Sequence, residues 1–140
     1  MRIMAIDYGD AHTGIAISDP TGLLAGFTTV INAYRPDRVT GQIALLAKEH
    51  RVERLVLGHP INMDGTRGPR SEKAQAMRQL LEETTGLPVV LWDERRTTID
   101  AHQILMSSGK NAKKRKKVVD AVAASLILEG YLNFKRMTQQ

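Results

Sequence analysis

The stretch from Arg2 to Asp7 constrains the fold of this chain more than any other. Its four apolar residues, Ile3 to Ile6, follow one another without a break, and the run ends at a carboxylate. Such a run is typical of a β-strand that is covered on both faces, as in α/β folds. Open α/β sheets bind ligands outside the carboxyl ends of their strands, so Asp7 is a candidate site residue. For Asp7 taken alone, a simple polar turn from Asp7 to Asp10 explains the pattern equally well.

The rest of the pattern predicts two further strands and then helices that alternate with strands. We expect strands at 13–18, 23–30, 55–57 and 89–92, helices at 36–50, about 70–85, 97–107 and 117–134, and a basic linker at 108–116. Short connections make the first three strands an antiparallel meander. Right-handed crossovers place the fourth and fifth strands parallel to the first. We therefore predict an α/β fold on a mixed five-stranded sheet, order 3-2-1-4-5, with helices on both faces.

Length and composition exclude several classes of protein. The 140 residues suffice for one domain, and we expect residues 1–140 to form it. The chain has no cysteine, which excludes disulfides and thiolate zinc sites. No apolar run approaches the ~20 residues of a membrane span, and Met1 and Arg2 lead directly into the first strand without a signal-peptide pattern. We expect a cytoplasmic protein that does not contact a membrane.

The charge of the chain favours a polyanionic partner. Its 20 Lys and Arg against 15 Asp and Glu give a net charge of +5 and a pI near 9.7. No acid occurs between Ala101 and Val119, and six basic residues crowd that window: Lys110, Lys113, Lys114, Arg115, Lys116 and Lys117. Such a block is usually only solvated. Because it is attached to the start of the last helix, we expect residues 113–117 to clamp a nucleic-acid backbone.

Acidic residues recur at the ends of predicted elements. The fifth strand stops at Asp93 and Glu94, and Asp120 lies near the start of the last helix. Helical spacing puts Asp120 on or beside the apolar stripe that contains Ala124 and Ile127. An isolated Asp in that first turn would only complement the helix dipole. However, Asp120, Asp7 and one of the two acids at the end of the fifth strand can converge on one small volume.

Three converging carboxylates favour divalent cations and hydrolytic chemistry. Like charges so close would raise one another's pKa unless a positive charge lay between them. Carboxylate oxygens suit Mg²⁺ or Mn²⁺, and two such ions ~4 Å apart can hydrolyse a phosphodiester by in-line displacement. Adjacent strand residues point to opposite faces, so alternation leaves both Asp93 and Glu94 open as the middle acid. We favour Glu94.

Five groups of residues, in order along nearly the whole chain, resemble the YqgF/RuvX family. They are Ile6–Gly9 with Gly14–Asp19, Gly58–Thr66 with Gly68–Arg70, Trp92–Arg95 with Thr97 and Thr98, Asp120–Ala124 with Ile127 and Leu128, and Tyr131 with Leu132. The most specific part is the loop Asn62-Met63-Asp64-Gly65-Thr66.

The resemblance implies an RNase H-like fold and a nuclease. The family was first called a Holliday junction resolvase by similarity to RuvC and is now regarded mainly as a nuclease that matures the 5′ end of pre-16S ribosomal RNA. It implies that Asp7, Glu94 and Asp120 are the catalytic acids. Unlike RuvC-type resolvases, the fourth strand ends without an acid, at Gly58-His59-Pro60. The resemblance therefore supports the fold more strongly than the resolvase activity.

Other residues near the predicted strand ends are candidates for nucleic-acid binding. For Asn62, Arg67 and Arg70, in and after the loop that follows the fourth strand, we favour phosphate positioning over turn chemistry. Arg95 can contact the scissile phosphate or pair with a carboxylate. His12 stands where the family often has Arg. Aromatic residues are too few for a base-stacking platform, with Tyr8, beside Asp7, as the exception to check.

Four functions fit these features. A nuclease that acts on precursor ribosomal RNA, with pre-ribosomal particles as a further partner, ranks first. A Holliday junction resolvase that cuts branched DNA keeps the same chemistry. A first strand that ends in Asp-x-Gly also resembles the phosphate loop of actin-like and sugar-kinase ATPases, which need two such domains. The fourth is a non-catalytic RNA-binding factor in ribosome assembly, which predicts that Asp7→Asn leaves function intact.

Overall fold

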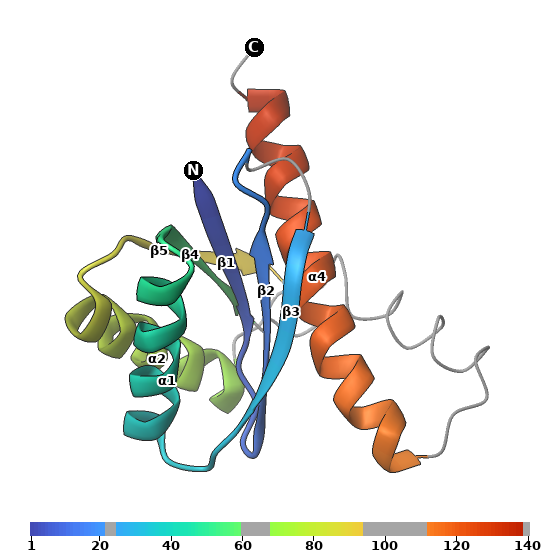
Figure 1. Cartoon of the computed structure of the whole chain (residues 1–140). Coiled ribbons are helices and arrows are strands. Elements are labelled where there is room, and N and C mark those ends of the chain that lie inside the picture. Colours follow the sequence, from blue (N-terminus) through green and yellow to red (C-terminus); the bar gives the residue numbers. More distant parts are fainter. Residues whose placement is uncertain (22–24, 60–67, 94–111, 139–140) are drawn as a thin grey trace.

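The computed structural model describes residues 1–21, 25–59, 68–93 and 112–138, with only the backbone at 25, 112–120 and 138 (Figure 1). Its elements are β1 (Arg2–Asp7), β2 (His12–Ser18), β3 (Ala25–Asn32), α1 (Pro36–Glu49), β4 (Val52–His59), α2 (Pro69–Thr85), β5 (Val89–Asp93) and α4 (Ala112–Thr138). The strands form a five-stranded sheet in the order β3-β2-β1-β4-β5. β1 to β3 are antiparallel, and β4 and β5 run parallel to β1. The predicted α/β architecture, strand order and meander are confirmed.

The central strand β1 is buried on both faces, as its sequence predicts. Ile3 to Ile6 are at most 1% exposed. Met4 and Ile6 face the layer of α1 and α2, whereas Ile3 and Ala5 face α4. Figure 1 shows α4 crossing the sheet on the side away from α1 and α2. Because side chains alternate along a strand, Asp7 falls on the α4 side.

Two clusters of apolar side chains hold the layers together. Under α1 and α2 the cluster includes Ile15, Ile17, Leu55, Leu57, Val39, Ile43, Met77 and Leu81. Under α4 it includes Ala16, Val56, Trp92, Ala124, Ile127 and Leu128. Trp92 meets Tyr131 edge to face, with 6.1 Å between ring centroids. The sheet therefore holds β1 rigidly from both sides, and Asp7 extends from a fixed strand.

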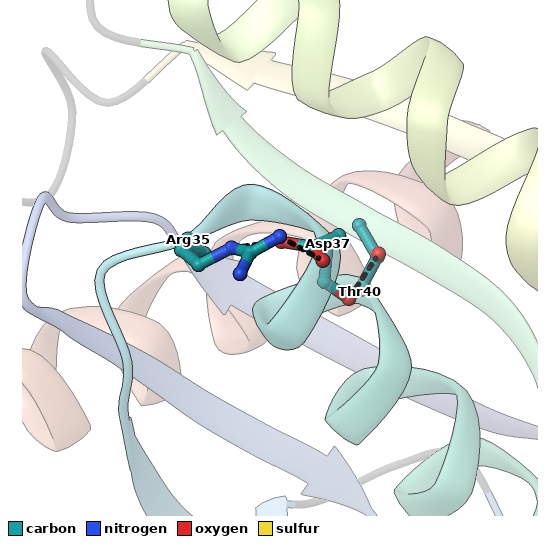
Figure 2. Close-up of polar contacts among 3 residues, drawn as sticks. All are labelled: Arg35, Asp37 and Thr40. Carbon is teal, nitrogen blue, oxygen red and sulfur yellow. Dashed lines mark hydrogen bonds and ion pairs between the residues drawn. The ribbon is translucent and has the colours of Figure 1, made fainter.

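Local signals define the helix ends close to the candidate site. Pro36 and Pro69 stand in the first turns of α1 and α2, where a missing N–H costs nothing. Before α1, Arg35 Nη2 lies 3.1 Å from Asp37 Oδ2, and the Thr40 hydroxyl donates to the Asp37 carbonyl at 3.1 Å (Figure 2). These contacts fix the start of α1.

Three predicted boundaries are wrong. α4 begins at Ala112, so residues 112–116 are helical and not a linker, because Ala, Lys and Arg are good helix formers and no Gly or Pro interrupts them. β4 extends over Val52–His59 because it pairs with β1 on one side and β5 on the other. β3, described over Ala25–Asn32, ends two residues later than predicted, and residues 23 and 24 of the predicted strand lie outside the described residues. The helix predicted at 97–107 lies outside the described residues. Within the described part of the chain, no helix is long and apolar enough to span a bilayer.

Candidate functional site

The carboxyl ends of β1, β4 and β5 lie side by side, and Asp7 is at their centre. On one side, Asp7 pairs with Gly14 of β2. On the other side, Ile6 pairs with Leu57 of β4, so the next residue of β4, Gly58, lies beside Asp7. Gly14 and Gly58 share the α4 face with Asp7, since they alternate with Ile15 and Leu57 of the opposite face. Both neighbours therefore lack a side chain that could fill the space beside the Asp7 carboxylate.

The environment of the Asp7 carboxylate suits it to act as a ligand of a divalent cation. Asp7 is half-buried. Within the described residues, no hydrogen bond or ion pair engages its side chain. A partly desolvated carboxylate normally acquires a partner, and hard divalent cations are bound by such oxygens. The donor chemistry at Asp7 therefore suits Mg²⁺ or Mn²⁺.

The side chains of β5 alternate between the two faces of the sheet, which decides the face on which Asp93 lies. Val89 and Leu91 pack under α1 and α2, whereas Val90 and Trp92 pack under α4. Asp93 follows Trp92 and so belongs to the α1 and α2 side, opposite to Asp7. Glu94 lies outside the described residues. The alternation disfavours Asp93 as a partner of Asp7.

The helix α4 runs antiparallel to β1, which directs its start toward the Asp7 end of the sheet. Near its other end, Lys135 Nζ donates to Met1 Sδ at 3.6 Å, and the Tyr131 hydroxyl accepts a hydrogen bond from Arg54 Nη1 at 2.8 Å. Figure 1 shows the first turns of α4 at the end of the molecule where the β1–β2 turn lies. Asp120 is four residues before the buried Ala124. The structure describes only the backbone of Asp120.

A small basic cavity lies at the start of α2, beside Tyr8, the residue that follows Asp7. Its volume is about 70 Å³, and its walls are Tyr8, Gly9, Asp10, Gly58, Arg70, Lys73 and Ala74. Lys73 Nζ lies 3.2 Å from Asp10 Oδ1, which ties α2 to the β1–β2 turn. Tyr8 and Arg70, both predicted from the sequence, therefore lie together. Lys73 was missed, although its position one turn after Arg70 in a helix places the two on the same face.

The β1–β2 turn depends on Gly9. A Cβ at this position would lie 2.4 Å from the His12 carbonyl oxygen, closer than real Cβ contacts allow. On β2, His12 Nδ1 lies 2.6 Å from Asn32 Oδ1 of β3. Since an amide oxygen only accepts, Nδ1 carries the hydrogen, and His12 is held at the edge of the sheet near Gly14.

The ionisation of Tyr8 is shifted by its surroundings. Burial raises the pKa of the Tyr8 hydroxyl above its ordinary value of 10.0, the negative charge of Asp10 raises this pKa further, and Lys73 partly opposes both. Desolvation disfavours the phenolate because the charged form loses more hydration. Tyr8 therefore remains a neutral donor at physiological pH.

The remaining predicted residues divide into two groups. Asn62, Arg67, Glu94 and Arg95 lie outside the described residues. Lys113, Lys114, Arg115, Lys116 and Lys117 lie in the first two turns of α4, where only the backbone is described. Among the described side chains, no group of three or more His, Asp or Glu could hold a metal ion. Asp7 is thus the one predicted catalytic acid whose side chain the structure describes.

Comparison with known proteins identifies related chains along almost the full length. The family model described as RuvX, Holliday junction resolvase, matches residues 1–134. A protein of Halothermothrix orenii named "Putative pre-16S rRNA nuclease" is 44% identical over 135 residues, covering 96% of each chain. A Bacillus subtilis protein of the same name is also 44% identical, covering 95% of this chain and 98% of its own.

Solved structures show the same fold. RuvC of T. thermophilus in complex with a Holliday junction superposes with a TM-score of 0.64 at 17% identity, covering 99% of this chain and 96% of RuvC. The Fowlpox virus resolvase with Holliday junction DNA gives a TM-score of 0.52 at 11% identity, covering 99% and 98%. At these identities the likeness concerns the fold, which is RNase H-like.

Proposed function

The chain belongs to the RuvX family, and from this membership we propose that it is a nuclease that hydrolyses phosphodiester bonds in structured RNA, at the 5′ end of pre-16S ribosomal RNA. Relatives at 44% identity over nearly the whole chain carry that nuclease name. The observation that carries the proposal is the position of Asp7. It is a half-buried carboxylate at the carboxyl end of the central strand, flanked by Gly14 and Gly58.

We propose Asp7, Glu94 and Asp120 as the catalytic acids. In the sequence Glu94 stands two residues after Trp92, which packs on the α4 side where Asp7 lies, whereas Asp93 belongs to the opposite face. From Lys135 back to Asp120, α4 rises about 22 Å. From Met1 to Asp7, β1 advances about 20 Å. Lys135 contacts Met1 and the two elements run in opposite directions, so these similar lengths support the proposal that Asp120 lies near Asp7.

The three acids suit a pair of hard divalent ions, Mg²⁺ or Mn²⁺. Bound there, such ions would supply an activated water and stabilise the leaving oxygen of the phosphodiester. The role of the chain is to hold the carboxylates at fixed positions. Asp7 is fixed by a strand buried on both faces, and the glycines at Gly14 and Gly58 leave room for a phosphate to approach.

Basic and polar residues around the acids position the nucleic acid. Tyr8, Arg70 and Lys73 line the cavity beside Gly58, and His12 lies at the adjacent edge of β2. We propose that Asn62, Arg67 and Arg95 act with them, and that Lys113, Lys114, Arg115, Lys116 and Lys117 follow the backbone from the start of α4. Contacts of this kind fix the register of the strand without reading its sequence.

A Holliday junction resolvase is the second candidate, since the description of the family favours it. Against it, β4 ends in His59, whose Nε2 lies 2.6 Å from the Ser71 hydroxyl of α2 in a buried contact. This residue joins β4 to α2 and adds no acid to the site. A non-catalytic factor for ribosome assembly, bound to pre-ribosomal particles, would need neither the acids nor the cations.

We further propose that residues 1–140 form a single nuclease domain that acts in the cytoplasm, where ribosomal RNA is matured. The support for one domain is structural. β1 to β5 build one sheet, and α4, from the end of the chain, packs on β1, β2 and β3.

The test is cleavage of precursor 16S RNA and of a four-way DNA junction, side by side, with Mg²⁺, Mn²⁺ or chelator. We expect cleavage of the RNA in either metal and none in chelator. Asp7→Asn should lower the rate about 100-fold or more while the protein still binds RNA. Glu49→Gln, which changes an exposed acid in the last turn of α1, is the matched control. Cleavage of neither substrate by the unmodified protein would contradict the proposal and favour the assembly factor.

A further inference from the structure

A second, larger cavity continues from the basic cavity along the α1 and α2 side of the sheet. Its volume is about 470 Å³, and its walls are Tyr8, Asp10, Tyr34, Pro36, Lys73, Ala76, Met77 and Leu80. Tyr8, Asp10 and Lys73 line both cavities, so the two lie side by side and together form one groove. One end of the combined groove therefore lies at Gly58, next to Asp7, and the other lies between α1 and α2.

The two ends of this groove differ in chemistry. At the Asp7 end, Arg70 and Lys73 supply positive charge, which suits phosphate. At the far end, the phenol ring of Tyr34 and the side chains of Met77 and Leu80 form the walls. Tyr34 is 80% exposed, so its ring is accessible to a ligand. A charged end followed by an aromatic end matches the order of phosphate and base in a nucleotide.

The segment that carries Tyr34 is fixed rather than free to collapse into the groove. Tyr34 directly precedes Arg35, which pairs with Asp37 at the start of α1 (Figure 2). Just before Tyr34, the N–H of Ala33 donates to the carbonyl of Ala11 at 3.1 Å, which joins this segment to the β1–β2 turn. On the opposite wall, Tyr8 is half-buried against the core and stays neutral. The backbone on either side of Tyr34 and the ring of Tyr8 are therefore held in place before any ligand binds.

We propose that this groove binds one unpaired nucleobase of the RNA strand, with Tyr34 as the stacking ring and Arg70 and Lys73 on the adjoining phosphate. This deepens the proposed function, on which it rests, by making an unpaired nucleotide beside the cleaved bond part of the substrate. Tyr34 is a positioning residue, because it lies on the α1 and α2 side of the sheet, away from the face of Asp7.

The test measures binding of a short single-stranded RNA that carries one 2-aminopurine, in chelator so that no cleavage occurs. We expect Tyr34→Ala to weaken binding by roughly 5- to 100-fold and to abolish the quenching of 2-aminopurine fluorescence that stacking causes. Tyr34→Phe keeps the ring and should restore both. Leu45→Ala, which removes an exposed apolar side chain of α1, is the matched control and should bind like the unmodified protein.

A second arm uses the same RNA with an abasic position in place of the 2-aminopurine. We expect this RNA to bind weakly and to be indifferent to Tyr34→Ala. Equal affinities of Tyr34→Ala and Leu45→Ala for the intact RNA would overturn the proposal. Because binding is measured without metal, a failure of the nuclease proposal appears in the cleavage assay alone, whereas a failure of the base site appears here.

Discussion

Tyr8 is the residue whose ionisation depends most clearly on the fold. Its hydroxyl is half-buried between the core and the ion pair of Asp10 with Lys73. Burial favours the neutral phenol, so the pKa is higher in the folded chain than in the unfolded one. The neutral phenol can donate to a phosphate, whereas a phenolate would repel it. Position and protonation state together therefore make Tyr8 suitable for nucleic-acid binding.

The shift of Tyr8 predicts a dependence of stability on pH. A raised folded-state pKa contributes stability that is fully present below the ordinary pKa of 10.0 and is lost as the pH rises through the folded value. We expect the unmodified protein to lose more free energy of unfolding than Tyr8→Phe as the pH rises above 10. Urea unfolding of both proteins at several alkaline pH values measures this. Parallel curves would contradict the shift.

At the residue scale, the sequence pattern indicates Asp7 as a site residue, but alternation alone does not decide between Asp93 and Glu94, of which Glu94 is favoured. A strand assigns neighbouring residues to opposite faces, and which face is which depends on what packs on the sheet. Trp92 under α4 and Leu91 under α2 supply that information, and they disfavour Asp93. Tyr34 was missed because a tyrosine in a connection has no periodic signal. Its role emerges only from the cavity that it lines with Tyr8.

The β1–β2 turn is the element on which the position of Asp7 depends most. Its chain passes so close to itself at Gly9 that any side chain there would meet the His12 carbonyl oxygen. In contrast, Gly41 lies within α1, and a Cβ there would meet nothing within 4 Å. Gly9 is required because the backbone at His12 approaches it closely, whereas Gly41 only adds to the conformational entropy lost on folding.

These two glycines form a matched pair for mutation. We expect Gly9→Ala to destabilise the protein by about 1–3 kcal/mol, since the turn must shift, and to lower cleavage because Asp7 moves with it. Gly41→Ala should stabilise α1 by about 0.5–1 kcal/mol and leave cleavage unchanged. Chemical denaturation and the cleavage assay measure both. Equal stability of the two variants would show that the turn has room for a side chain.

At the element scale, the order of strands was predictable because short connections and right-handed crossovers leave few alternatives. Element ends were less predictable. The basic run 113–117 looks like a linker by charge, yet it is helical because local helix propensity outweighs the repulsion of like charges. The apolar run 55–57 predicts only a short fourth strand. β4 nevertheless begins at Val52, because backbone pairing with β1 does not require apolar side chains at Glu53 or Arg54.

On the scale of the whole molecule, charge is unevenly distributed. The chain has a net charge of +5. Two groups of basic residues contribute to it, Lys113 to Lys117 at the start of α4 and Arg70 with Lys73 at the start of α2. Both helix starts lie at the end of the sheet where β1 stops (Figure 1). A polyanion is therefore attracted to the same end of the molecule that carries Asp7.

This distribution predicts how salt affects RNA binding. Affinity should fall linearly with salt on logarithmic axes, and Arg70→Gln should reduce the slope by about 0.7, the value of one lost phosphate contact to a single strand. Arg78→Gln removes the same charge from the same helix, where Arg78 pairs with Glu82, and should leave the slope unchanged. Fluorescence anisotropy across a salt series measures both. Identical slopes for the two variants would show that Arg70 does not contact the RNA backbone.

The central claim is that Asp7, Glu94 and Asp120, far apart in the chain, bind divalent cations together. The most direct measurement is a Mn²⁺ titration followed by electron paramagnetic resonance, with the unmodified protein, Asp7→Asn, Glu94→Gln, Asp120→Asn and the control Glu49→Gln. We predict that each of the first three substitutions weakens Mn²⁺ binding by about 10-fold or more and that Glu49→Gln does not. Unchanged Mn²⁺ binding by Asp7→Asn and Asp120→Asn would contradict the account.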